Sequence, residues 1–119
     1  WVQAIPSVWD EPFGIVAIEA MARGTAVIAS SSGGLGETVE DGVGGFLTPP
    51  GDADALSEKL TLILGDKRLA SSMAAAAKRA ASERFSEEAF LRQLFRIYDS
   101  VLSARSGNTG KRMRSGFSA

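Results

Sequence analysis

The most informative part of this sequence is residues 6–22, which read Pro6-Ser7-Val8-Trp9-Asp10-Glu11-Pro12-Phe13-Gly14-Ile15-Val16-Ala17-Ile18-Glu19-Ala20-Met21-Ala22. The pattern is typical of a strand end, a short loop and the first turns of a helix. Pro12 stands where a helix start tolerates a missing N–H, and Gly14 has no Cβ to block a group that approaches the backbone. The first N–H groups of a helix have no partner within it and lie at the positive end of its dipole. The stretch therefore predicts a phosphate-binding site.

Two carboxylates, Glu11 and Glu19, bracket this helix start. Glu11 precedes the first turn, and Glu19 falls about one and a half turns into a helix expected from Phe13 to Arg23. A ligand with phosphate in its middle and hydroxyl groups at both ends suits this arrangement, and a nucleotide-sugar is such a ligand. Two other interpretations stay open at this point. The glutamates can be solvated surface carboxylates without a role, or the carboxylate pair of a glycoside hydrolase.

The segments around this stretch predict the fold class. Apolar runs at residues 1–5, 25–29 and 46–48 alternate with stretches of helical character. This order predicts right-handed βαβ units with a parallel sheet, so an α/β fold of the doubly wound kind. Ile15, Ile18 and Ala22 recur at helical spacing and predict the buried face of the first helix. Three strands make an incomplete sheet, so we expect the rest of the domain upstream and an exposed, association-prone strand edge at residues 1–5.

The second half of the sequence is predicted to be helical. Asp52 and Asp66 are expected to cap two successive helices, and Ser86 is expected to open a third. After about Ser103 the apolar periodicity is lost and Ser, Gly, Asn and Arg dominate. Residues 1–103 are therefore interpreted as a partial, Rossmann-like nucleotide-sugar-binding domain with C-terminal helices, and residues 104–119 as a disordered basic tail.

Composition excludes several classes of function. All 14 acidic residues precede position 101, whereas four of the 13 basic residues follow it, so the globular part is mildly acidic and no nucleic-acid partner is expected. The basic tail instead predicts weak peripheral contact with an anionic membrane. The chain has no Cys and no His, which excludes disulfides and thiolate chemistry and removes the commonest metal ligand. No apolar run is long enough to span a bilayer, and we expect a cytoplasmic location.

The central stretch resembles the E-x7-E signature of retaining glycosyltransferases with the two-domain GT-B architecture, and is most similar to the group often called family four. The motif runs here from Glu11 to Glu19. Further matching segments follow or flank it in order: Pro6-Ser7, Glu19-Ala20-Met21-Ala22, Gly24-Thr25-Ala26-Val27-Ile28-Ala29, Gly33-Gly34, Glu37, Glu40-Asp41-Gly42, Gly45-Phe46-Leu47 and Pro49-Pro50-Gly51-Asp52. The resemblance covers residues 1 to about 102 and implies the C-terminal half of a donor-binding C-terminal domain. Gly36 departs from the pattern, since relatives often carry proline there.

The resemblance also implies roles for individual residues. Glu11 is the implied catalytic residue, which hydrogen-bonds hydroxyls of the donor sugar, and Glu19 binds the ribose hydroxyls of the nucleotide. Backbone N–H groups hold the donor sugar and its diphosphate. The implied donor-binding set is Glu11, Phe13, Gly14, Ile15, Val16 and Glu19. Three further candidates lie in the next loop: Gly33, Gly34 and Glu37.

The implied activity is transfer of a sugar, of the hexosyl type, from a nucleotide-sugar to an acceptor hydroxyl with retention of configuration. No metal and no other cofactor are expected, because positive side chains and helix dipoles neutralise the leaving diphosphate. In the family the basic residues, the base-recognition loop and the acceptor domain lie upstream. An N-terminal acceptor domain is therefore an expected partner, and these 119 residues alone are expected to be inactive. The alternative is a non-catalytic module that binds a nucleotide-sugar or a protein partner.

Overall fold

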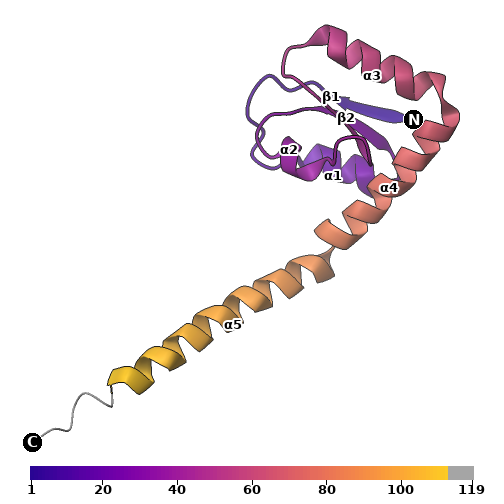
Figure 1. The fold of residues 1–119 in the computed structure, drawn as a ribbon. Helices are drawn as coiled ribbons and strands as arrows, with labels where there is room; N and C mark the ends of the chain where they lie inside the picture. The colour runs from indigo at the N-terminus through magenta and orange to yellow at the C-terminus, as the bar shows by residue number, and fades with distance from the viewer. Residues whose placement is uncertain (113–119) are drawn as a thin grey trace, which may run out of the picture. The chain divides into compact units, whose positions relative to one another are not determined.

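A computed structural model describes residues 1–112, with side chains described through residue 105. The chain divides into two units, the first spanning Trp1–Phe85 and the second beginning at Ser86. The elements of the first unit are β1 (Val2–Ile5), α1 (Ile15–Ala22), β2 (Ala26–Ser30), α2 (Leu35–Thr38), β3 (Gly45–Thr48), α3 (Ala53–Gly65) and α4 (Lys67–Phe85). The second unit contains α5 (Glu87–Arg112). The order of elements in the first unit matches the predicted alternation of strands and helices (Figure 1).

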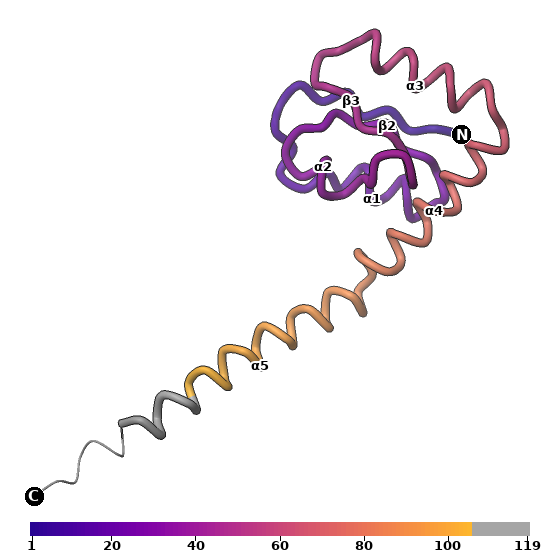
Figure 2. Tube along the Cα trace, viewed as in Figure 1, coloured from indigo at the N-terminus to yellow at the C-terminus, as the bar shows by residue number. Residues whose placement is uncertain are grey.

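The three strands form one parallel sheet in the order β1-β2-β3. Ile5 pairs with Ala29, and Ser30 pairs with Thr48, so the strands end at nearly the same level. Every residue of the central strand β2 is buried, as expected for a strand covered on both faces. The parallel order and the short connections place the loops that follow β1 and β2 next to each other at the carboxyl edge of the sheet (Figure 2).

Helices cover both faces of the sheet, so the predicted doubly wound arrangement is confirmed. On one face α1, α2 and α4 pack on the strands around Met21, Val27 and Leu35. On the other face α3 and α4 pack around Ile28 and Ile63. Figure 1 shows α3 on one side of the strands and α1 and α2 on the opposite side. Alternate residues of β2 supply the two cores, because successive side chains of a strand point to opposite faces.

Helix α1 begins two residues later than predicted and buries a different face. Gly14 precedes it with φ 77° and ψ 47°, in the left-handed region, which breaks the helix before Ile15. Its buried residues are Ala17 and Met21, whereas Ile15 is 62% exposed and Ala22 is also exposed. The predicted face of Ile15, Ile18 and Ala22 was wrong. The apolar pattern includes residues that border an open cavity at the start of the helix rather than the core.

The predicted helix caps are confirmed. Asp52 Oδ1 accepts a hydrogen bond of 2.9 Å from the Ala55 N–H at the start of α3. Asp66 Oδ1 accepts from the Arg68 and Leu69 N–H groups at the start of α4. A short polar side chain at these positions satisfies N–H groups that have no partner within the helix, which fixes where each helix begins.

The second unit differs from the tail predicted for residues 104–119. Helix α5 continues to Arg112, beyond the predicted boundary at 103, because loss of the apolar periodicity does not by itself end a helix and no proline interrupts it, although Gly107 and Gly110 are weak helix formers. The rest of the predicted tail, residues 113–119, lies outside the described residues. Within α5 itself Phe90, Phe95 and Tyr98 are each more than half exposed. Each helix among the described residues is too short or too polar to span a bilayer.

Candidate functional site

The loop between β1 and α1, residues 6–14 (the motif loop), carries Glu11, and a hydrogen bond within this loop fixes the Glu11 side chain. Ser7, which is buried, donates its hydroxyl to Glu11 Oε1 at 2.9 Å. This bond fixes one carboxylate oxygen at the carboxyl end of β1 and leaves Oε2 for a ligand. Glu11 itself is only partly exposed, so its side chain is oriented by the protein rather than by solvent.

The start of α1 presents a run of backbone donors. The Ala17 N–H already bonds the Gly14 carbonyl at 3.0 Å, so the helix hydrogen bonds begin there. Among the described residues no partner is found for the N–H groups of Phe13, Gly14, Ile15 and Val16. Gly14, in the left-handed conformation, directly precedes Ile15, so these groups lie just before or within the first turn of α1, where the helix dipole favours an anion.

The segment that follows β2 is hydrogen-bonded to the motif loop at several positions. Gly34 donates its N–H to the Glu11 carbonyl at 2.6 Å. Ser32 Oγ donates to the Trp9 carbonyl at 3.0 Å. Thr38 Oγ1 shares its one hydrogen between the Phe13 carbonyl at 3.0 Å and the Gly34 carbonyl at 2.9 Å. Three bonds from residues 32–38 therefore hold alternate carbonyls, those of Trp9, Glu11 and Phe13, and the two loops form one rigid piece.

Two glycines allow this close approach. A Cβ on Gly33 would meet the backbone oxygen and nitrogen of Glu11, and Gly33 also has φ +50°. A Cβ on Gly34 would lie 2.7 Å from the Pro12 carbonyl oxygen and 2.8 Å from the Phe13 Cα. Any side chain at either position would push the motif loop away from β2. Gly33 and Gly34, singled out as possible ligand contacts, thus contact the motif loop itself.

A cavity of about 410 Å³ lies where the motif loop and the start of α1 meet the edge strand β1. Its lining residues are Gln3, Ala4, Ile5, Pro6, Glu11, Pro12, Phe13, Gly14, Ile15 and Val16. The structure therefore brings together five of the six residues of the predicted donor-binding set. Sequence reasoning missed the wall supplied by residues 3–6, because the outer face of an edge strand looks the same as a buried one in the sequence.

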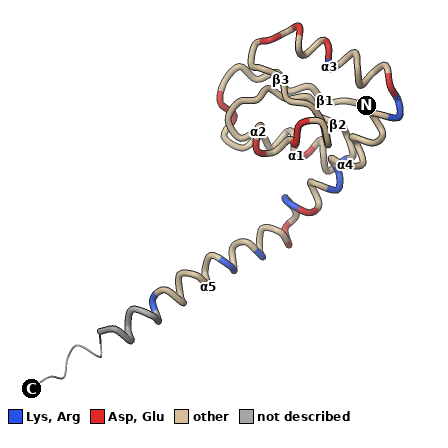
Figure 3. Tube along the Cα trace, viewed as in Figure 1, with Lys and Arg blue, Asp and Glu red and all other residues tan. Residues whose placement is uncertain are grey.

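The remaining predicted residues lie outside this cavity. Glu19 is exposed on α1, one turn beyond the helix start. Glu37 is exposed on α2, and its carbonyl accepts a hydrogen bond from the Arg84 guanidinium, so this residue is tied to α4. No Lys or Arg is among the residues that line the cavity. Basic positions lie instead on α3 to α5 and at Arg23, at the far end of α1 (Figure 3).

Fold and site together define a class: a parallel α/β domain whose ligand cavity lies at the carboxyl ends of its strands, beside a helix start. A family model described as "Glycosyl transferases group 1" matches residues 1–80. The chain belongs to this family of glycosyltransferases. The expected glycosyltransferase resemblance is thus confirmed at the level of the family.

Relatives extend the likeness over most of the chain. The phosphatidyl-myo-inositol mannosyltransferase of Mycobacterium leprae is 35% identical over 105 residues, which are 88% of this chain and 28% of the relative. Sucrose-phosphate synthase from Thermosynechococcus elongatus superposes with a TM-score of 0.76 at 42% identity, over 87% of this chain and 26% of that one. The structure of Anabaena Alr3699/HepE in complex with UDP superposes with a TM-score of 0.78 at 36% identity, over 83% of this chain and 27% of that one.

These comparisons confirm the predicted fold class, because the similar structures are GT-B glycosyltransferases with a Rossmann-like domain. The chain spans about a quarter of the length of the curated relatives that it matches.

Proposed function

We propose that this chain supplies the donor-binding part of a glycosyltransferase that moves a sugar from a nucleotide-sugar to an acceptor hydroxyl with retention of configuration. One observation carries the proposal: a carboxylate held by Ser7 and a run of open N–H groups line the same cavity of about 410 Å³. The family membership supports the reaction class. The Anabaena Alr3699/HepE structures are complexes with UDP and with UDP-glucose, which supports a nucleotide-sugar as the ligand.

In this proposal the start of α1 binds the diphosphate. Phe13 to Val16 line the cavity, and their N–H groups, for which no partner is found among the described residues, lie at the positive end of the helix dipole. They would stabilise the negative charge that grows on the leaving diphosphate as the sugar–oxygen bond breaks. Backbone donors are fixed before the reaction begins, so little reorganisation is needed when this charge develops.

Glu11 is the proposed catalytic residue. Its Oε1 is engaged by Ser7, which leaves Oε2 to accept hydrogen bonds from hydroxyls of the donor sugar and to hold the ring in place for transfer. Glu19 is the proposed ribose ligand. It lies four residues after the first residue of α1, about 6 Å along the helix axis, which is a fitting span from the diphosphate to the ribose.

The finer parts of the proposal follow the family resemblance. We propose a hexosyl donor and a second, N-terminal domain that brings the acceptor, since relatives are about four times as long as this chain. The diphosphate is held without a metal, and the 119 residues alone are inactive. The protein acts in the cytoplasm, with weak contact to an anionic membrane through its basic C-terminal residues.

A second candidate is a module that binds a nucleotide-sugar without catalysis. The cavity lining without any Lys or Arg favours it, because a diphosphate held by backbone donors alone is less fully neutralised. The two candidates share the donor site and differ in whether a longer form of the protein, with an acceptor domain, transfers sugar.

The first prediction tests the donor site directly. Glu19→Ala is expected to weaken binding of UDP-glucose or of another nucleotide-sugar about 10- to 150-fold, because hydrogen bonds from hydroxyls to a carboxylate are lost. The measurement is calorimetric titration of the chain with UDP-, GDP- and ADP-sugars. Glu83→Ala is the matched control, since Glu83 is also an exposed glutamate on a helix, away from the cavity. Equal affinities for the two variants would refute the assignment of Glu19.

A transfer assay separates the two candidates. In a longer polypeptide that includes an acceptor domain, Glu11→Gln is expected to lower the transfer rate while the protein still binds the nucleotide. Unchanged transfer in Glu11→Gln would refute the catalytic role, and complete absence of transfer in the unmodified protein would favour the binding module.

A further inference from the structure

A second group of polar side chains lies at the carboxyl edge of the sheet, on the face opposite the candidate donor site. Ser30 pairs with Thr48 at the ends of β2 and β3, and Pro6 follows Ile5 beside Ser30. Ile28 and Phe46, two residues earlier on these strands, belong to the core under α3. Because side chains alternate along a strand, the Ser30 and Thr48 hydroxyls also face α3.

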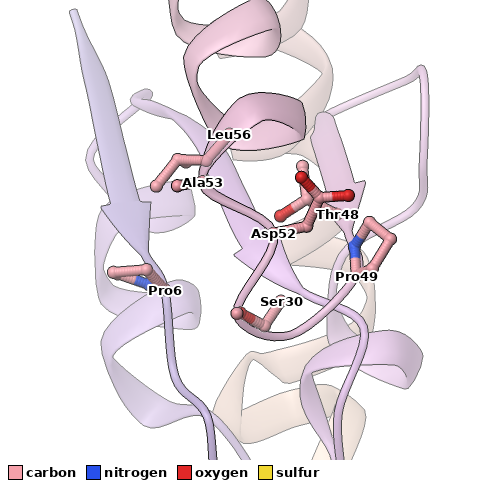
Figure 4. Close-up of a pocket in the computed structure, with 8 residues that line it drawn as sticks. Pro6, Ser30, Thr48, Pro49, Asp52, Ala53 and Leu56 are labelled. Carbon is pink, nitrogen blue, oxygen red and sulfur yellow. The ribbon is translucent and has the colours of Figure 1, made fainter.

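These residues border a small pocket of about 130 Å³. The lining is completed by the first residues of α3 and the turn before it: Pro6, Ser30, Thr48, Pro49, Gly51, Asp52, Ala53 and Leu56. Figure 4 shows Ser30, Thr48 and Asp52 grouped between the strand ends and the start of α3. The volume equals about four waters, so the pocket can hold a small polyol or one edge of a sugar ring.

Ser30 and Thr48 are buried residues whose hydroxyls have no hydrogen-bond partner in the described part of the protein. Ser30 is 2% exposed and Thr48 is 4% exposed. Within the described part of the chain, neither side-chain oxygen has a hydrogen bond, and neither is fully sealed from solvent. Both residues line the pocket. Two neighbouring hydroxyls that have no protein partner and are open to solvent are available to a ligand that can replace water there.

The start of α3 adds donors and an acceptor. The Asp52 carboxylate uses Oδ1 to cap the Ala55 N–H, and no partner is found for Oδ2 among the described residues. The Ala53 N–H is open, since the helix hydrogen bonds begin with Leu56 bonding the Asp52 carbonyl. The side chains of Pro6, Pro49 and Leu56 supply apolar walls.

Charge decides the class of ligand. Asp52 lines the pocket and Asp54 lies in the same helical turn, while no Lys or Arg lines it. An anion would be repelled by these carboxylates. A neutral ligand with several hydroxyls can donate to Asp52 and both donate to and accept from Ser30 and Thr48, while its C–H surface packs on the proline rings.

We propose that this pocket is a carbohydrate subsite that binds the hydroxyls of a sugar ring. The preference for a sugar over another polyol rests on the proposed function, whereas the hydroxyl-binding chemistry does not. Pro6 lines both this pocket and the donor cavity, so the two sites are neighbours around one residue. A sugar bound here would belong to the acceptor or to a longer glycan, separate from the sugar of the donor.

The test is a titration of the isotopically labelled 119-residue chain with glucose and with glycerol, followed by amide NMR spectra. Glucose is expected to shift the amide signals of Ser30, Thr48 and Ala53. Ser30→Ala and Thr48→Val are each expected to weaken its binding about two- to tenfold, because one hydrogen bond is lost. Thr61→Val is the matched control, since Thr61 is exposed on α3 and away from the pocket.

A blocking variant covers the case in which the hydroxyl variants fold poorly. Ala53 is exposed at the pocket mouth, so Ala53→Leu fills the pocket without entering the core and is expected to abolish the shifts. Unchanged glucose affinity in Ser30→Ala, Thr48→Val and Ala53→Leu would overturn the subsite, as would the absence of any shift. Stronger binding of glycerol than of glucose would overturn the sugar assignment.

The same samples distinguish this inference from the proposed function. Weaker glucose binding in Thr48→Val, together with UDP-glucose binding that is unaffected by Glu19→Ala, would support the subsite and refute the donor site. The converse result would refute the subsite and leave the donor site standing.

Discussion

Four glycine-to-alanine substitutions separate backbone strain from close packing at the candidate donor site. Gly33 has both problems, since it has φ +50° and its Cβ would meet the Glu11 backbone. Gly42 has only the strain, with φ +80° and open space around it. Gly34 has only the overlap, with the Pro12 and Phe13 backbone. Gly36 has neither and lies in α2.

The expected changes in unfolding free energy follow from these two terms. An alanine in the left-handed region costs about 1–2 kcal/mol, so Gly42→Ala is expected to lose that amount. Overlap with a packed backbone costs about 1–3 kcal/mol, which is expected for Gly34→Ala. Gly33→Ala combines both terms and is expected to lose about 2–5 kcal/mol. Gly36→Ala is expected to gain about 0.4–1 kcal/mol, because alanine suits a helix and restricts the unfolded chain.

The assay is urea unfolding followed by far-ultraviolet circular dichroism, with the midpoint and slope fitted for each variant. UDP-glucose affinity is measured on the same proteins. Gly33→Ala and Gly34→Ala are expected to weaken it, since they displace the loop that carries Glu11, whereas Gly42→Ala leaves it unchanged. A Gly33→Ala variant that is no less stable than Gly42→Ala would refute the packing of the two loops against each other.

Two further predictions concern the support of the site and the core. Thr38→Val removes the buried hydroxyl that bonds the Phe13 carbonyl, and is expected to lower the unfolding free energy by about 1–3 kcal/mol in urea unfolding. A loss no larger than that of the control Thr61→Val, at an exposed position, would contradict the role of this hydroxyl. Ile63→Ala empties a fully buried position under α3 and is expected to cost about 2–5 kcal/mol, whereas the neighbouring Leu64→Ala, at a 56% exposed position, should cost much less. Equal urea midpoints for Ile63→Ala and Leu64→Ala would contradict the assignment of Ile63 to the buried face of α3.

Much of the fold could be predicted because its signals are local. A fully apolar run such as residues 26–29 has few uses other than a buried strand, and Asp52 before a helical pattern satisfies the N–H groups that the helix leaves open. The position of α1 was predicted less well. Ile15 looks like a core residue in the sequence, but it borders the cavity because Gly14 delays the helix start.

The candidate site was predictable where its residues are contiguous. Glu11 and the residues of the helix start follow one another, so the cavity could be placed from the motif alone. The packing of Gly34 against the motif loop could not be predicted. In the sequence a pair of glycines in a loop indicates only flexibility, because the neighbouring segment that requires the missing Cβ is not known. The pairing of Ser30 with Thr48 depends on the register of two strands, which hydrophobic patterns do not give when both faces are buried.

The hydrogen bonds between residues 9–13 and residues 32–38 mean that residues 6–22 depend on a second segment of the chain for their conformation. Residues 6–22 transplanted into another parallel α/β scaffold would lack the donor that bonds the Glu11 carbonyl and the glycines that let a second loop lie against it. A functional graft must therefore carry both segments, together with the strand β2 that sets their spacing. By the same reasoning, a change in either segment during divergence needs a compensating change in the other, so the two are expected to be inherited as one unit.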